Sequence, residues 1–265
     1  MTVLIDTHCH LLPGIDDGPA NLETALAMAE AAVADGVAAV IVTPHYITGL
    51  YEPSPDSIRQ AVSGLSEYLR SQGIALELYL GCEAALDPAL PRWCREGAVL
   101  TLAERGKHVL VEMPASEVPG YTEEVLYQLQ LAGLTPVLAH PERNSRIQRD
   151  PGWLARMVER GVLVQVTAAS LTGHFGRKVE KLARQLVKNG TVHLIATDAH
   201  STGGRGPRLK PALRALAPVL TDEALGWLFS ENPAAIVEGR DIRSFTAGRW
   251  LRKRSLWARL ATKDL

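Results

Sequence analysis

Residues 6–19 read DTHCHLLPGIDDGP. Two histidines, His8 and His10, flank one cysteine, and two aspartates, Asp16 and Asp17, follow shortly after them. Imidazoles at this spacing beside an apolar strand are either metal ligands or the polar end of an ordinary strand. The other strands of the chain provide the means to choose between these two interpretations.

The composition is that of a globular protein. The length of 265 residues fits one large domain, including a single α/β barrel. An apolar content of 46% allows a sizeable core, and the formal net charge of −1 points to neither an acidic nor a basic partner. Three cysteines are too few and too unevenly spaced for a disulfide framework. With no signal-peptide pattern and no long apolar run, the sequence predicts a cytoplasmic protein without a transmembrane segment.

Short apolar runs alternate with longer amphipathic segments along the chain. Strands are expected at residues 3–6, 38–43, 76–81, 109–112, 136–139, 163–166 and 194–196. Helices are expected at residues 21–35, 56–72, 122–132, 153–160 and 178–189, most of them closed by a glycine. Such alternation predicts an α/β fold with a parallel sheet. Because there are seven such units and no GxGxxG turn follows the first strand, a closed (β/α)7 barrel is favoured over a doubly wound sheet.

Six of the seven expected strands end in a side chain able to bind a metal. In chain order, the candidates are His8, His10, Asp17, His45, Glu83, Glu112, His140, Asp198 and His200. A parallel barrel gathers the carboxyl ends of its strands at one mouth, where barrel active sites lie. A single histidine at a strand end is more often structural. Metal-binding side chains at the same position of six strand–helix units, however, indicate a metal site. His108 and His193 begin strands and are interpreted as structural, and His174 as a solvated loop side chain.

Imidazole and carboxylate ligands suit Zn²⁺, Mn²⁺ or Fe. Nine candidates exceed the four to six ligands of one ion, so they indicate two or three ions bridged by a carboxylate. Clustered divalent ions clamp the attacking and leaving oxygens of a phosphoryl transfer. Arg143 and Arg205 follow His140 and His200 closely, and guanidinium groups bind phosphate in bidentate fashion. A surface salt bridge is the alternative role for each arginine.

Five motifs in the same order resemble the PHP (polymerase and histidinol phosphatase) superfamily. They resemble most closely its bacterial protein-tyrosine phosphatase branch, found with capsular and exopolysaccharide synthesis genes. The motifs are DTHCHLLPGIDDGP, TPHYITGLYE, LGCE, AHPERN and TDAHSTGGR, which span residues 6–205. The resemblance implies a distorted seven-stranded barrel with three divalent metal ions, Mn²⁺ first, with Fe or Zn as alternatives.

The resemblance also implies a role for each candidate residue. His8, His10, Glu83 and Asp198 would hold the first metal. Glu83 would bridge to a second metal bound by Glu112 and His140, and Asp17, His45 and His200 would hold the third. Arg143 and Arg205 would grip the phosphate and act in catalysis. Asp6 is interpreted as a structural residue behind the histidines.

The implied reaction is hydrolysis of phosphotyrosine by attack of a metal-bound hydroxide. The expected substrate is the Tyr-rich tail of a bacterial tyrosine kinase that controls polysaccharide synthesis and export. Phenolate, with a parent pKa of about 10, leaves with less protonation than an alkoxide needs. A general acid is not assigned; Asp16, Tyr46 and Tyr51 are candidates.

The same residues allow other hypotheses about function. A cysteine-dependent phosphatase is excluded, because no arginine stands six residues after Cys9, Cys82 or Cys94. A small-molecule PHP phosphatase, for example for histidinol phosphate, is the main alternative. An inactive binder of phosphorylated tails is a third reading. The expected barrel has no basic stripe with interleaved aromatics, which argues against a nucleic-acid partner.

Residues 1–240 are expected to form one barrel domain, followed by a basic extension over residues 241–265. Trp250 and Trp257 are interleaved with basic side chains in this extension. The extension is either a terminal helix packed on the barrel or an interfacial helix that binds a partner or the inner membrane. The sequence does not indicate an oligomeric state.

Overall fold

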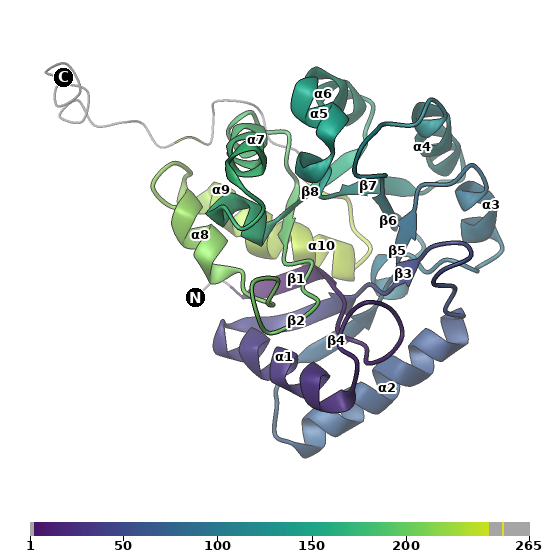
Figure 1. Cartoon of the computed structure of the whole chain (residues 1–265), viewed down its shortest axis with the longest axis vertical. Helices are drawn as coiled ribbons and strands as arrows, with labels where there is room; N and C mark the ends of the chain where they lie inside the picture. The colour runs from purple at the N-terminus through teal and green to yellow at the C-terminus, as the bar shows by residue number, and fades with distance from the viewer. Residues whose placement is uncertain (1–2, 244–250, 252–265) are drawn as a thin grey trace, which may run out of the picture.

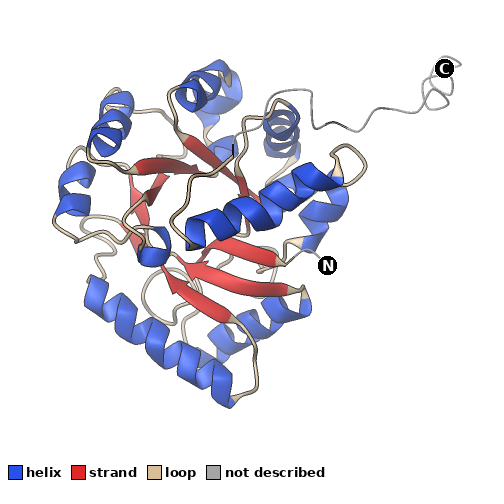
Figure 2. Cartoon of the chain, turned by 180° about the vertical axis from the view of Figure 1, so that it is seen from behind, coloured by secondary structure: helices blue, strands red, loops and turns tan. Residues whose placement is uncertain are grey.

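The computed structural model describes residues 3–243 and residue 251, with strands at the centre and helices around them (Figures 1 and 2). The strands are β1 (Leu4–Cys9), β2 (Val37–Val42), β3 (His45–Tyr46), β4 (Glu77–Leu80), β5 (Glu83–Ala85), β6 (His108–Glu112), β7 (Thr135–Ala139), β8 (Leu163–Thr167) and β9 (Leu194–Ala196). The α-helices are α1 (Leu22–Ala34), α2 (Pro55–Ser71), α3 (Leu90–Arg95), α4 (Thr122–Leu131), α5 (Ser145–Arg149), α6 (Gly152–Glu159), α7 (Arg177–Lys188), α8 (Lys210–Leu216), α9 (Asp222–Gly226) and α10 (Asn232–Val237). Short helical turns are η1 (Leu102–Glu104), η2 (Pro141–Arg143), η3 (Ala168–Thr172) and η4 (Trp227–Glu231).

All strand pairs are parallel, as the alternation predicts, but the hydrogen bonds divide the strands into two sheets. One sheet has the order β1-β2-β4, and the other has the order β3-β5-β6-β7-β8-β9. Thr43 and Pro44 separate β2 from β3, and Gly81 and Cys82 separate β4 from β5. Proline has no N–H to donate to a ladder, so a break at Pro44 is physically reasonable.

The expected closure into a single (β/α)7 barrel is not confirmed. At the open side, β1 meets the segment after β9 through the isolated bridge between Cys9 and Ala199. Two hydrogen bonds accompany it: His10 N donates to Ala199 O at 2.9 Å, and Asp198 N donates to His8 O at 2.8 Å. What is confirmed is the α/β fold with parallel sheets.

The expected elements occur with small shifts at their ends. The largest shift is in the first strand, which continues to Cys9 and therefore contains His8. The side chain of Asn21 caps α1 by accepting from Thr24 N at 2.9 Å. The short helices α3, α5, α8, α9 and α10 were not predicted, because five to seven residues show too little periodicity.

Most strands have a buried side chain on nearly every position because both faces of the sheets are covered, whereas β4 at the edge of its sheet is partly exposed. One apolar cluster lies between the strands and the surrounding helices. A smaller cluster joins strand residues such as Leu110 and Val137 to Ile236 of α10. Side chains two positions apart share a face, so Glu112 at the end of β6 lies on the same face as Leu110. The site is therefore built above this smaller apolar cluster.

Residues 252–265, with most of the expected basic extension, lie outside the described residues, and the boundary at residue 240 stays a prediction. No helix within the described residues has the length and hydropathy needed to cross a bilayer.

A substitution at Gly81 tests how tightly the connection between β4 and β5 is packed. An added Cβ would lie 2.8 Å from Ile41 Cγ2 and 3.2 Å from the Val42 carbonyl oxygen. Because Ile41 is fully buried, we expect Gly81→Ala to lower the free energy of unfolding by about 1–3 kcal/mol in urea denaturation.

The matched control is Gly64→Ala on the exposed side of α2, where an added Cβ meets no atom within 4 Å. Helix propensity predicts that this change raises stability by about 0.5–1 kcal/mol. Wild-type stability in Gly81→Ala would show that the close approach is not a constraint.

Candidate metal centre

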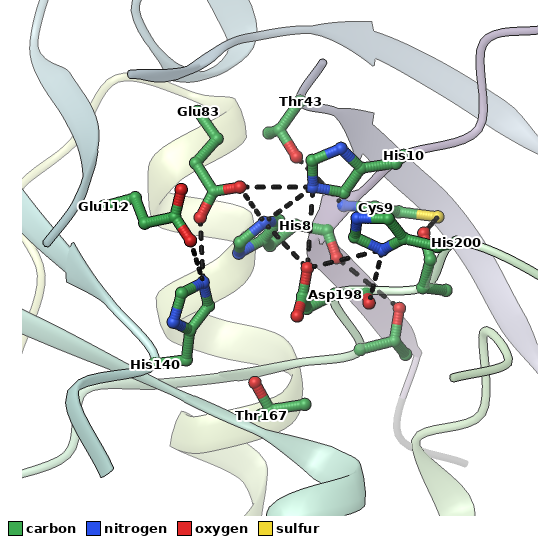
Figure 3. Close-up of polar contacts among 12 residues, drawn as sticks. His8, Cys9, His10, Thr43, Glu83, Glu112, His140, Thr167, Asp198 and His200 are labelled. Carbon is green, nitrogen blue, oxygen red and sulfur yellow. Dashed lines mark hydrogen bonds and ion pairs between the residues drawn. The ribbon is translucent and has the colours of Figure 1, made fainter. Parts of the chain in front are cut away.

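All nine side chains expected to bind metal lie together at the carboxyl ends of the strands. Figure 3 labels all of them except Asp17 and His45. Three groups of them have possible ligand atoms within 4.8 Å of one another. The groups are His8, His10, Glu83 and Asp198; His45, Glu83 and Glu112; and His10, Asp17, His45 and His200. His140 joins them through Glu83.

The first group is almost completely buried. Nε2 of His8 lies 3.1 Å from Glu83 Oε2 and 3.3 Å from Asp198 Oδ1. Nε2 of His10 lies 3.2 Å from the same Glu83 oxygen and 3.5 Å from the same Asp198 oxygen. The two Nε2 atoms are themselves 3.2 Å apart. Four donor atoms thus face one small space, which is the arrangement of a coordination site.

The opposite ring nitrogens of both histidines are held by other side chains. His8 Nδ1 lies 3.1 Å from Gln165 Oε1, and His10 Nδ1 lies 2.6 Å from Asp16 Oδ2. An Nδ1–H donated to such an oxygen leaves the Nε2 lone pair free for a metal, as is usual for histidine ligands. Gln165 was not predicted from the sequence, although it is the lone amide in strand β8, and Asp16 was considered only as a candidate general acid.

Glu83 connects the first group to a second one. Its Oε1 lies 2.9 Å from His140 Nε2, which is also 3.7 Å from Glu112 Oε1. Its Oε2 lies 3.2 Å from His45 Nδ1, which is 3.7 Å from Glu112 Oε2. The carboxylate therefore has imidazoles at both oxygens, as a bridging ligand requires. His45 lies between the second and third groups, whereas the sequence-based assignment puts it in the third group alone.

The third group lies closer to solvent. Asp17 Oδ1 is 3.2 Å from His200 Nε2 and 3.5 Å from His45 Nε2, and the Asp17 side chain is 48% exposed. The rings of His10 and His200 stack with their centroids 3.9 Å apart. These contacts bring His10 into this group as well as the first.

The buried carboxylates attract positive charge strongly. Burial would raise the pKa of Glu83, but the charge of His8 and the hydrogen bond with His10 outweigh it and hold that pKa well below its ordinary value. The pKa of Asp198 is likewise held well below its ordinary value, against its burial. Burial and the charge of Glu83 raise the pKa of Glu112 to about 7. A divalent cation among these groups would compensate charges that are costly to bury, so the donors fit a metal.

Two site residues have backbone conformations that are unfavourable for residues other than glycine. His140 has φ 31° and Asp198 has φ 51°. Gln165 Oε1 accepts from His140 N at 3.3 Å, and His8 O accepts from Asp198 N at 2.8 Å. Such conformations persist where the surroundings fix them, and they are concentrated at functional sites.

Arg143 and Arg205 both point at Asp198, on the oxygen that faces away from the two histidines. Nη2 of Arg143 donates to Asp198 Oδ2 at 2.5 Å and to Thr167 Oγ1 at 2.5 Å. Nη2 of Arg205 donates to the same Oδ2 at 3.0 Å and lies 3.2 Å from His200 Nε2. The buried Nε atoms of both arginines have no acceptor among the described residues. Two guanidinium groups with unused donors beside carboxylate clusters are suited to bind a phosphoryl group.

The remaining histidines are distributed as expected, with one exception. His108 is the first residue of β6, and His193 directly precedes β9. Burial is the main cause that lowers the pKa of each to about 4. His174 is exposed, but its ring is packed against Gly204, where an added Cβ would be 2.3 Å from His174 Cε1. It is therefore more than a freely solvated loop side chain.

Asp16 is a poor candidate for a general acid. Burial would raise its pKa, but the hydrogen bond and charge of His10 lower the pKa to about 2. Asp16 is thus ionised near neutral pH and occupied as an acceptor. Tyr51 stacks on His45 with the ring centroids 6.1 Å apart, and Tyr46 packs on Trp93.

Burial raises the thiol pKa of Cys9 and Cys82 well above the ordinary value. Neither cysteine is a reactive thiolate, which agrees with the exclusion of a cysteine-dependent mechanism.

Comparisons with known proteins agree with the geometry. Tyrosine-protein phosphatase YwqE of Bacillus subtilis is 35% identical over 239 residues, covering 90% of this chain and 93% of YwqE. CapC of Staphylococcus aureus is 31% identical over 207 residues, covering 78% of this chain and 81% of CapC. A crystal structure from work on YwqE and CpsB of Streptococcus pneumoniae, described as unique metal-dependent tyrosine phosphatases, superposes with a TM-score of 0.86. It is 33% identical and covers 95% of this chain and 100% of that chain.

More distant structures share the fold alone. A phosphotriesterase homology protein of Escherichia coli superposes with a TM-score of 0.56 at 14% identity, over 88% of this chain and 98% of that chain.

The family model for capsular polysaccharide synthesis, CpsB/CapC, matches residues 4–238. With this match and the shared length of its relatives, the chain belongs to the CpsB/CapC family.

Proposed function

We propose that this chain is a metal-dependent protein-tyrosine phosphatase. The observation that carries the proposal is the position of Asp198, with its Oδ1 among the histidines of the first group and its Oδ2 at both arginines. A phosphoryl group at this point would meet the metal-binding groups on one side and guanidinium donors on the other. The family relatives and the similar crystal structure from the work on YwqE and CpsB support the same activity.

The metal assignment proposed here has three divalent ions, with Mn²⁺ expected. His8, His10, Glu83 and Asp198 would hold one ion, and Glu83, Glu112 and His140 a second. Asp17, His45 and His200 would hold the third, with His10 close to it. Divalent ions held by these residues would lower the pKa of a bound water and neutralise charge on phosphoryl oxygens.

The two arginines have a separate task in this proposal. They donate hydrogen bonds to the phosphoryl oxygens and stabilise their negative charge in the transition state. Phenolate is a good leaving group, so a strong general acid is not essential. Tyr51, which lies beside His45, remains the better placed of the two tyrosine candidates.

The proposed substrate is a phosphotyrosine-bearing protein, first of all the tail of a tyrosine kinase that controls polysaccharide synthesis. A cytoplasmic location beside such a kinase stays a prediction.

We further propose that the two sheets together form one distorted barrel of seven units. In this view β2 continues into β3 and β4 into β5, with Glu83 N donating to Pro44 O at 3.0 Å across the break.

Metal removal tests the proposed chemistry. Dialysis against a strong chelator should lower phosphotyrosyl-peptide turnover by more than about 100-fold, since several ligands then lack their cation. Adding Mn²⁺ back should restore the rate, with metal content followed by elemental analysis. Full turnover by protein shown to be free of metal would contradict the mechanism.

Paired variants separate metal binding from phosphate binding. Arg143→Ala should keep its metal and lose about 10²- to 10³-fold in kcat, the usual effect of removing one donor to a developing charge. His8→Ala should lose metal content as well as rate. If both variants kept full metal content and full rate, the active site would lie elsewhere.

Substrate preference separates the proposed function from the small-molecule alternative. We expect kcat/KM for a phosphotyrosyl peptide to exceed that for histidinol phosphate by at least about tenfold, a difference of about 1.4 kcal/mol in the transition state. A clear preference for histidinol phosphate would overturn the assignment to protein substrates.

A further inference from the structure

The loop between η3 and α7 meets both arginine-bearing segments, although these are far from it in the sequence. Cζ of Arg143 lies 4.1 Å from the centroid of the Phe175 ring. The neighbouring His174 ring lies against Gly204, the residue before Arg205. The two rings contact each other edge to face, with centroids 4.8 Å apart at 84°.

The backbone of this loop is suited to hold the two rings in place. Gly173 and Gly176 flank them, and each has φ 88°, a conformation that glycine adopts without strain. His174 N donates to Ala169 O at 3.1 Å, and Gly176 N donates to Gly173 O at 3.0 Å. The sequence Gly-His-Phe-Gly is thus a tight turn that presents its two aromatic side chains together.

The Phe175 ring lies beneath Cζ of a guanidinium group whose donors are only partly used. Nη2 of Arg143 donates to Thr167 and Asp198, while the buried Nε has no acceptor among the described residues. Guanidinium hydrogen bonds lie in the plane of the group, so a contact that limits rotation of the group also limits the directions of its donors. The Nε donor is left for an anion.

We propose that Phe175 is a positioning residue that holds the guanidinium group of Arg143 in place for binding the phosphoryl group. His174 supports the same arrangement from the other side by packing on the loop that carries Arg205. The inference rests on the proposed function of this site, because it takes Arg143 to be the phosphate ligand. It adds a residue outside the five motifs that carry the family resemblance.

The test compares Phe175→Leu, which keeps apolar volume, with Phe175→Tyr, which keeps the aromatic face. Inorganic phosphate binding to the Mn²⁺-loaded protein is measured by calorimetry, and KM and kcat are measured with a phosphotyrosyl peptide. We expect Phe175→Leu to weaken phosphate binding and raise KM by roughly 3- to 30-fold, the range of a cation–π contact. Phe175→Tyr should stay within about twofold of wild type, and metal content should be unchanged in both.

Tyr127→Ala is the matched control, since Tyr127 is an exposed aromatic residue on α4 that contacts neither arginine. It should bind phosphate as wild type does. Wild-type phosphate binding by Phe175→Leu, or equal losses in the leucine and tyrosine variants, would overturn the inference. Failure of the wild-type enzyme to hydrolyse the peptide would instead overturn the proposed function, and phosphate binding would still test Phe175.

Discussion

The site depends on two carboxylates that are buried beside each other. Glu83 and Asp198 are 0% and 1% exposed, and each lies within 3.5 Å of both His8 and His10. Burying two negative charges is expensive unless positive charge is placed between them. The held-down pKa values of both carboxylates show how strongly the surroundings favour their ionised forms. The hydrogen bonds from Arg143 and Arg205 to Asp198 supply part of this positive charge, and a bound cation would supply the rest.

Segments that are far apart in the sequence hold these carboxylates in place. Asp198 keeps an unfavourable backbone conformation because its N–H bonds to His8 O and its neighbour Ala199 bridges to Cys9. The same contact joins the first strand to the segment after the last one. The residues that bring the two ends of the strand array together are thus neighbours of the residues that form the site.

The candidate metal-binding side chains could be predicted from the sequence because parallel strands end at one edge. Glu83, Glu112 and Asp198 each follow an apolar run in the same phase, so their convergence needed no coordinates. Gln165 and Thr167 were missed, since a polar residue within or at the end of a buried strand gives no sign of its partner. The division into two sheets depends on local breaks such as Pro44, whose effect on the ladder cannot be read from periodicity.

Glu83 and Asp198 are the proposed ligands of divalent cations, and anomalous X-ray diffraction from crystals of the Mn²⁺-loaded protein tests this directly. We expect anomalous peaks within bonding distance of both carboxylates, with Glu83 shared between two of them. An absence of peaks there, with the carboxylates bonded only to protonated histidines, would contradict it.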